Sequence, residues 1–150
     1  MAICYRCRGA EKETKFSSHP LYTPELDVFF RSLYTSTKGG ASSRGLPFLI
    51  YKEDLLERYL KNDGCCEASG VVLKPFKKKG AGKNLLAPSI DRIDSSKGYT
   101  TDNIQVVAHI VNIMKTDLTM DAFVIWCQRI ATYRDLKTEK LADELEKLVE

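Results

Sequence analysis

The sequence predicts an α+β protein of one domain, in which a small strand–loop–strand–helix unit is flanked by several helices. The chain has 150 residues, of which 43% are hydrophobic, and this is enough for one ordinary core. Residues 89–94, Ser-Ile-Asp-Arg-Ile-Asp, place two isoleucines among polar side chains, and we interpret them as a half-buried strand. A second short apolar run follows at 104–107, and from about Ala108 the apolar spacing becomes helical.

Two amphipathic helices are expected before this unit. The first starts with an N-cap threonine and a proline at 23–24 and runs to about Lys38, where the Gly39-Gly40 pair ends it. The second spans about 52–62 and buries leucines on one side. The segment 65–88 contains an apolar run that predicts a short strand or hairpin arm.

Two more helices are expected after the unit, one capped by Thr119 and one starting at Thr138, each with an apolar stripe. The predicted organisation is an N-terminal segment (1–22), a helical lead-in (23–64), the strand–loop–strand–helix core (65–118) and C-terminal helices packed on that core (119–150).

The net charge of +3 says little about partners, but the lysines are unevenly placed. A basic run with interspersed glycines contains Lys74, Lys77, Lys78, Lys79 and Lys83. Such a run either lies along nucleic-acid phosphates or only keeps a loop soluble. No apolar span of 18 residues occurs and the N-terminus has no apolar signal core, so we expect an intracellular protein, in the cytoplasm of its host cell, without a membrane partner.

The five cysteines predict thiols or metal ligands rather than disulfides, because an intracellular compartment is reducing. Cys4 and Cys7 form a C-x-x-C pair, which suits one half of a structural zinc site. His19 and one of Cys65 and Cys66 are the residues available to complete it. Without them, Cys4 and Cys7 are ordinary thiols.

The polar residues of 87–115 predict a site. His109, Asn112 and Lys115 are three apart on the expected helix and share a face. If the helix packs across the two strands, Asp91 can face Asn112. A carboxylate and a carboxamide suit a hard cation such as Mg²⁺, while Asn103 is placed to hold the loop by hydrogen bonds to its backbone.

At this point the residues resemble a known family. The order D-R-I-D (91–94), K-G-Y (97–99), D-N-I-Q (102–105) and V-N-I-M-K (111–115) is similar to the ββα-metal fold of the HNH endonucleases. It is most similar to the branch common in bacteriophages and mobile elements, which carries D-R-I-D. Upstream, C-E-A-S-G (66–70) resembles the end of that branch's helical lead-in, so that the similarity covers about residues 40–118.

The resemblance implies hydrolysis of DNA phosphodiesters with one divalent cation, Mg²⁺ or Mn²⁺. It places the metal ligands at Asp91 and Asn112 and assigns the orientation of the loop and of the general base to Asn103. Contacts to DNA phosphates are expected from lysines and an arginine, namely Lys77, Lys78, Lys79, Lys97, Lys115 and Arg44.

Arg92 stands where the resemblance places the general-base histidine. An arginine cannot take a proton from water near neutral pH, although it can clamp a phosphate oxygen. The base must therefore be Asp94, His109 or a solvent hydroxide.

Three functions compete on this basis. The first is a metal-dependent endonuclease or nickase, encoded by a phage or mobile element. The second is a nucleic-acid-binding relative with little or no cleavage, because Arg92 replaces the base. The third is a zinc-stabilised regulatory or interaction protein built around Cys4 and Cys7. The retention of both expected metal ligands favours the first, and the sequence leaves the oligomeric state open.

Overall fold

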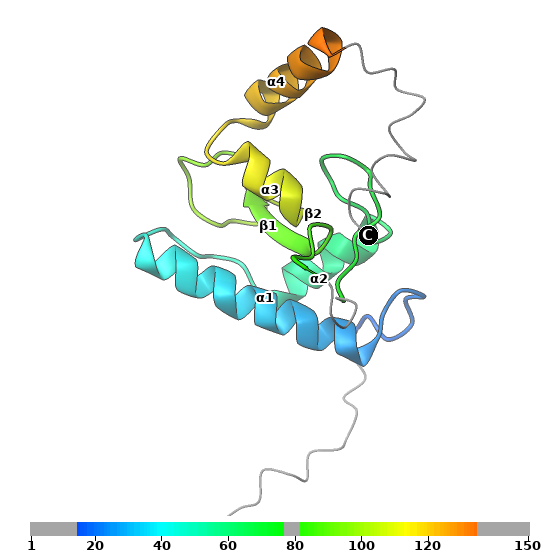
Figure 1. Cartoon of the computed structure of the whole chain (residues 1–150). Helices are drawn as coiled ribbons and strands as arrows, with labels where there is room; N and C mark the ends of the chain where they lie inside the picture. Colours follow the sequence, from blue (N-terminus) through cyan, green and yellow to red (C-terminus); the bar gives the residue numbers. More distant parts are fainter. Residues whose placement is uncertain (1–14, 77–81, 135–150) are drawn as a thin grey trace, which may run out of the picture.

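The fold is α+β, and the residues that the structure describes form four helices and one two-stranded sheet (Figure 1). The computed structural model describes residues 15–76 and 82–134. The elements in chain order are α1 (Pro24–Ser43), α2 (Lys52–Lys61), β1 (Pro88–Arg92), β2 (Ile104–Ala108), α3 (His109–Lys115) and α4 (Met120–Tyr133). In the part of the chain that the structure describes, no helix is long and apolar enough to cross a membrane.

Helix α1 begins as predicted but ends later. The Thr23 hydroxyl accepts a hydrogen bond from the backbone N–H of Leu26 at 3.2 Å, as an N-cap does. The predicted break after Lys38 is wrong, because the helix continues through Gly39 and Gly40 to Ser43. Each glycine costs about 1 kcal/mol of helix propensity, but the complete burial of Ala41 in the next turn holds the extra turn against the core.

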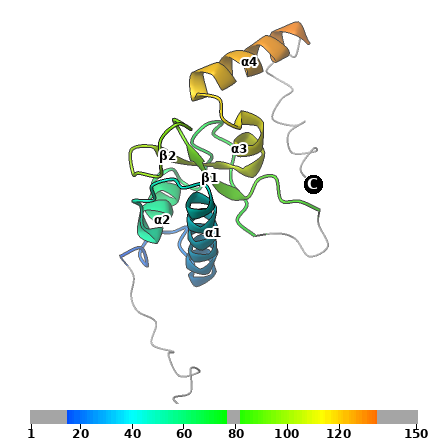
Figure 2. The same cartoon turned by 90° about the vertical axis from the view of Figure 1, so that its left-hand side faces the viewer.

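Helix α2 packs against α1 (Figure 1), and it buries the leucine face that the sequence predicts. Its first turn is capped by Asp54, whose carboxylate accepts the backbone N–H of Tyr51 at 2.7 Å. The rings of Phe30 in α1 and Tyr59 in α2 are in contact, tilted by 55° with their centroids 5.2 Å apart. These two helices form the layer that supports the sheet, as both views show (Figures 1 and 2).

Strands β1 and β2 form an antiparallel hairpin in which Asp91 pairs with Gln105 and Ile90 with Val106. All five residues of β2 are buried. Its outer edge is covered by the 66–70 turn, since Glu67 donates its backbone N–H to Val106 O at 3.0 Å and accepts the N–H of Val106 on its carboxylate. Cys65 and Val72 make only an isolated bridge, so the strand expected in 65–88 is reduced to one residue pair.

The loop between the strands, 93–103, is pinned at two points. The backbone of Tyr99 donates to Pro47 O at 2.8 Å and accepts from Leu49 N at 2.8 Å. Asn103 is buried and holds the loop from inside, as its sequence position predicts. Its amide nitrogen donates to Asp94 O and Gly98 O, and its carbonyl oxygen accepts the N–H of Asp94.

Helix α4 starts at the predicted cap, where the Thr119 hydroxyl accepts the N–H of Ala122. The expected packing of the C-terminal helices on the core is not observed for α4, which buries no residue and stands apart from the body in both views (Figures 1 and 2). Its Trp126 and Ile130 are about 60% exposed. The helix predicted from Thr138 lies outside the described residues.

Candidate active site

The side chain of Asp91 lies at the centre of the hairpin and is only 4% exposed. Strand β1 carries it opposite Gln105 on β2, and the Gln105 amide nitrogen donates to its Oδ2 at 2.7 Å. The Lys115 ammonium from the last turn of α3 lies 3.2 Å from its Oδ1. Both carboxylate oxygens of Asp91 therefore have one partner each. Because a carboxylate offers about four lone-pair positions, each oxygen can still accept a further contact.

Lys115 is completely buried, with no exposed surface. Besides Asp91, its ammonium donates to the backbone oxygen of Arg92 at 2.9 Å and lies 3.5 Å from the Ser95 hydroxyl. The expectation that Lys115 contacts a DNA phosphate does not fit this arrangement, because a buried ammonium with its own carboxylate partner is not offered to the surface.

Asn112 projects from α3 toward β1. Its amide nitrogen donates to the Ser89 hydroxyl at 2.8 Å and to the backbone oxygen of Ile90 at 3.3 Å. The carbonyl oxygen of the same side chain accepts no hydrogen bond from the described residues. Asn112 is thus oriented by its nitrogen, and its oxygen remains available as a donor atom for a cation.

Asp91 and Asn112 line one small cavity of about 210 Å³. Its other walls are Arg44, Ile90, Arg92, Ser95, Tyr99, Thr116 and Asp117. A wider groove of about 520 Å³ adjoins it between α1 and α3, and shares Arg44, Ile90, Tyr99 and Asn112 with it. Helix α1 lines this groove with Ser32, Ser36 and Gly40 and also with Phe29, Leu33 and Thr37. The cavity and the groove, which share four lining residues, are together called the depression.

Arg92 is anchored to the loop that follows β1. Its Nη1 donates to the backbone oxygens of Ser95 at 2.6 Å and Lys97 at 2.7 Å. Its guanidinium carbon lies 5.5 Å from the centroid of the Tyr99 ring, and the Tyr99 hydroxyl accepts a hydrogen bond from Arg44 at 2.9 Å. One end of Arg92 thus holds the loop, while its other nitrogens have no hydrogen-bond partner among the described residues.

Asp94 is a poor candidate for the general base. It lies beyond the end of β1, not on the strand as expected, and it does not line the cavity. Hydrogen bonds from the side chain of Ser96 and from Lys97, together with the Ser96 backbone N–H, lower the pKa of Asp94 from 3.8 to about 2. A carboxylate with such a pKa is a weaker proton acceptor than an ordinary one.

His109 is the first residue of α3 and lines the wider groove, one turn from Asn112. Partial burial lowers the pKa of His109 below 6.5, and the nearby Lys83 charge lowers it further. The imidazole is therefore neutral near pH 7 and able to accept a proton. Of the two side chains proposed as the base, His109 is the one that the structure brings to the depression.

The remaining predicted residues lie away from this site or outside the described ranges. Lys97 is exposed and pairs with Asp94 at 3.0 Å. Lys77, Lys78 and Lys79, and the zinc candidates Cys4 and Cys7, lie outside the described residues. Cys66 is buried, and its sulfur accepts the N–H of Ala108. Within residues 15–76 and 82–134, no group of three or more histidine, cysteine or acidic side chains could hold a metal ion.

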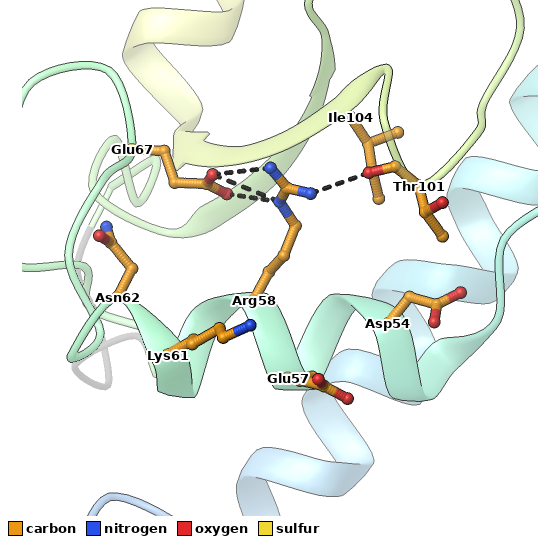
Figure 3. A pocket seen from close by; sticks show the side chains of 8 residues that line it. All are labelled: Asp54, Glu57, Arg58, Lys61, Asn62, Glu67, Thr101 and Ile104. Atoms are coloured by element: carbon orange, nitrogen blue, oxygen red, sulfur yellow. Dashed lines mark hydrogen bonds and ion pairs between the residues drawn. The ribbon is translucent and has the colours of Figure 1, made fainter.

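Two features were missed from the sequence. Gln105 meets Asp91 because the strand register places the two residues opposite each other, and this register cannot be read from the D-N-I-Q motif. Arg58 and Glu67 form the second feature, an ion pair at 3.0 Å beside another cavity of about 390 Å³ (Figure 3). Arg58 also donates to Thr101 O at 2.9 Å, which ties α2 to the end of the loop. In the sequence, the only signal for this ion pair is that Arg58 and Glu67 carry opposite charges and lie nine residues apart.

The comparisons with known proteins agree with the architecture. No family model matches the chain. An uncharacterised protein, R423 of Acanthamoeba polyphaga mimivirus, is 28% identical over 134 residues; the match covers 86% of this chain but only 23% of that protein. Among solved structures, the rare-cutting HNH restriction endonuclease PacI superposes with a TM-score of 0.50 at 18% identity, over 89% of this chain and 95% of PacI. The chain therefore has an HNH-like fold with a ββα core.

Proposed function

We propose that the protein is a metal-dependent DNA endonuclease or nickase whose active site is the cavity between β1 and α3. One observation carries the proposal: Asp91 and Asn112, on separate elements, line the same small cavity beside a wider groove. The likeness of the fold to PacI, an HNH restriction endonuclease, supports this assignment. The proposed site of action is the interior of a host cell, and a phage or mobile-element origin stays a prediction.

The residues present fit one hard divalent cation, Mg²⁺ or Mn²⁺. Asp91 contributes a carboxylate with unused lone pairs, and Asn112 contributes a carbonyl oxygen that is oriented by the hydrogen bonds of its own nitrogen. Mg²⁺ is commonly held by one or two carboxylates and by phosphate oxygens of the substrate, with water in the remaining positions. The cation would supply charge neutralisation at the scissile phosphate and at the leaving oxygen.

The protein's own residues provide the rest of the reaction. In the proposal, the DNA strand follows the groove beside α1, where the small side chains of Ser32, Ser36 and Gly40 leave room for a backbone. The nitrogens of Arg92 that have no partner among the described residues bind a phosphate oxygen. His109 accepts the proton of the attacking water, since its lowered pKa keeps it neutral near pH 7. Lys77, Lys78, Lys79 and Lys97 add contacts to phosphates farther along the strand.

A second candidate function is nucleic-acid binding with little or no cleavage. Two observations favour it: Lys115 already neutralises the carboxylate of Asp91, and Arg92 uses one of its nitrogens to hold loop backbone. If the positive charge of Lys115 keeps a divalent cation out of the cavity even when DNA is bound, the protein binds its substrate without hydrolysing it.

The test is the conversion of supercoiled plasmid to nicked or linear DNA in Mg²⁺ or Mn²⁺. Metal-ion catalysis is worth several kcal/mol, so Asp91→Ala and Asn112→Ala should each reduce the rate by about 100-fold or more. Asp54→Ala is a suitable control, because it removes the cap of α2 and lies at the separate cavity of Figure 3.

Three outcomes separate the candidates. Metal-dependent nicking by the wild type and by Asp54→Ala, with loss in both site variants, supports the nuclease. Retention of plasmid binding without nicking in either metal supports the binding relative. Equal nicking by all four proteins would show that the cavity is not the active site.

A further inference from the structure

The buried ion pair between Lys115 and Asp91 lies inside the proposed active site and has no role in the mechanism above. Lys115 has no exposed surface and Asp91 has 4%. Separating an ion pair that is buried from solvent is unfavourable, because it leaves an unpaired ammonium in the protein interior. Lys115 is also retained by Arg92 O at 2.9 Å. The ammonium is therefore a permanent neighbour of the carboxylate and not a transient occupant.

The formal charges around the cavity show what this neighbour does. Two acids, Asp91 and Asp117, and two arginines, Arg44 and Arg92, line the cavity and cancel one another. Lys115 forms an ion pair with Asp91 without lining the cavity, and it adds one positive charge. The free protein thus offers a divalent cation two good oxygen donors in a setting whose formal charge is +1.

We infer that Lys115 is a built-in counter-ion of Asp91, so that the free protein binds a divalent cation weakly and binds it well only together with a DNA phosphate. This inference rests on the proposed function for its second half. A phosphodiester brings one negative charge and additional oxygen ligands into the same cavity, which reverses the electrostatic balance that the ammonium sets. Lys115 is in this sense a positioning residue, because it acts through Asp91 and does not reach the substrate.

The geometry also determines which part of Asp91 remains available. Lys115 takes one lone pair of Oδ1 and Gln105 takes one of Oδ2. The remaining lone pairs lie on a carboxylate whose rotation is blocked from both ends. Asp91 therefore presents a fixed, partly neutralised oxygen to the cavity, which suits a cation that keeps most of its water until a phosphate arrives.

The test measures the affinity for Mn²⁺ directly, by electron paramagnetic resonance of free Mn²⁺ at pH 8 without DNA. Lys115→Met removes the charge and keeps an unbranched side chain of similar length. We expect it to bind Mn²⁺ at least about tenfold more tightly than the wild type, because a positive charge a few ångströms from the cation has been removed. Adding Asp91→Asn to this variant should abolish the gain.

Lys52→Met is the matched control. Lys52 pairs with the largely buried Asp27 at 2.8 Å between α1 and α2, so its loss also breaks a Lys–Asp pair but at a distance from the cavity. Its affinity for Mn²⁺ should equal that of the wild type. Equal or weaker binding by folded Lys115→Met would overturn the inference, since a purely structural lysine cannot tighten metal binding when it is removed.

A second measurement needs no variant at position 115. Wild-type protein should bind Mn²⁺ at least about tenfold more tightly with a duplex oligonucleotide than without it, after subtraction of the binding seen with Asp91→Asn and the same duplex. Equal affinity with and without DNA would overturn the inference even if Lys115→Met does not fold. If Lys115→Met binds Mn²⁺ tightly but no protein nicks plasmid, the proposed nuclease function is wrong and the counter-ion role of Lys115 stands. If nicking depends on Asp91 but Lys115→Met leaves the affinity for Mn²⁺ unchanged, only the counter-ion role of Lys115 is wrong.

Discussion

Gly98→Ala should destabilise the protein, although Gly98 does not have a positive φ. A Cβ added there would lie 2.5 Å from the backbone oxygen of Pro47 and 2.8 Å from its Cβ. Ordinary contacts begin at 3.4 Å, so the loop would have to retreat by about an ångström. The clash is with backbone and a proline ring, neither of which can rotate away.

The retreat would weaken the two hydrogen bonds that pin the loop, from Tyr99 N to Pro47 O and from Leu49 N to Tyr99 O, both 2.8 Å. Overpacking of this kind costs about 1–3 kcal/mol, and each lost backbone hydrogen bond about 1 kcal/mol. We expect the free energy of unfolding to fall by about 3 kcal/mol and the midpoint of thermal unfolding by about 6–12 °C.

The assay is urea unfolding of purified wild type and variant, with the midpoint and slope fitted separately. Gly39→Ala is the matched control, because it is the same substitution near the C-terminal end of α1, where an added Cβ meets nothing within 4 Å. It should raise the free energy of unfolding by up to about 1 kcal/mol through helix propensity. A loss below about 0.5 kcal/mol for Gly98→Ala would refute the steric argument.

Three further predictions concern the loop and the proton acceptor. Asn103→Ala removes three hydrogen bonds to loop backbone and should lower the free energy of unfolding by about 2–3 kcal/mol; an unchanged urea midpoint would contradict the pinning role. The pKa of Asp94 is lowered from 3.8 to about 2, chiefly by the side-chain hydrogen bond from Ser96, so its carboxylate stabilises the fold above about pH 4 and this stabilisation is lost as the pH falls toward 2. Asp94→Asn should therefore differ from the wild type in unfolding at pH 7 and match it near pH 2, and a constant difference over that range would argue against the assignment. If His109 is the base, the nicking rate should rise with pH through a midpoint below 6.5, because burial first and then Lys83 lower its pKa; a limb that persists in His109→Gln would exclude it.

The helices and strands of the described core were largely predictable because their signals are local. Proline and capping residues mark where a helix can begin, and the spacing of leucines marks the buried face of α2. The strands expected at 89–94 and 104–107 correspond to β1 and β2. Each of these patterns depends on residues within one or two turns or pleats, so a single sequence contains them in full.

The departures have a common physical cause, which is that burial is not a local property. The Gly39-Gly40 pair predicts a helix end, yet α1 continues because Ala41 is fully buried in the core. The apolar spacing of α4 predicts packing on the core, yet Trp126 and Ile130 are exposed among the described residues. Propensity and periodicity describe what a segment can do, and tertiary contacts determine whether it does so.

By itself, the sequence determined which chemical groups the small ββα unit carries and in which order: Asp91, Arg92, Asn103, His109 and Asn112. That order also carried the resemblance to HNH endonucleases. Only the tertiary structure decided which atoms meet. The strand register set Gln105 against Asp91, and the packing of α3 buried Lys115, read from the sequence as a phosphate contact, against the same carboxylate. Contacts between these groups depend on the packing of segments that are distant in the sequence. The sequence therefore does not distinguish a buried lysine from an exposed one.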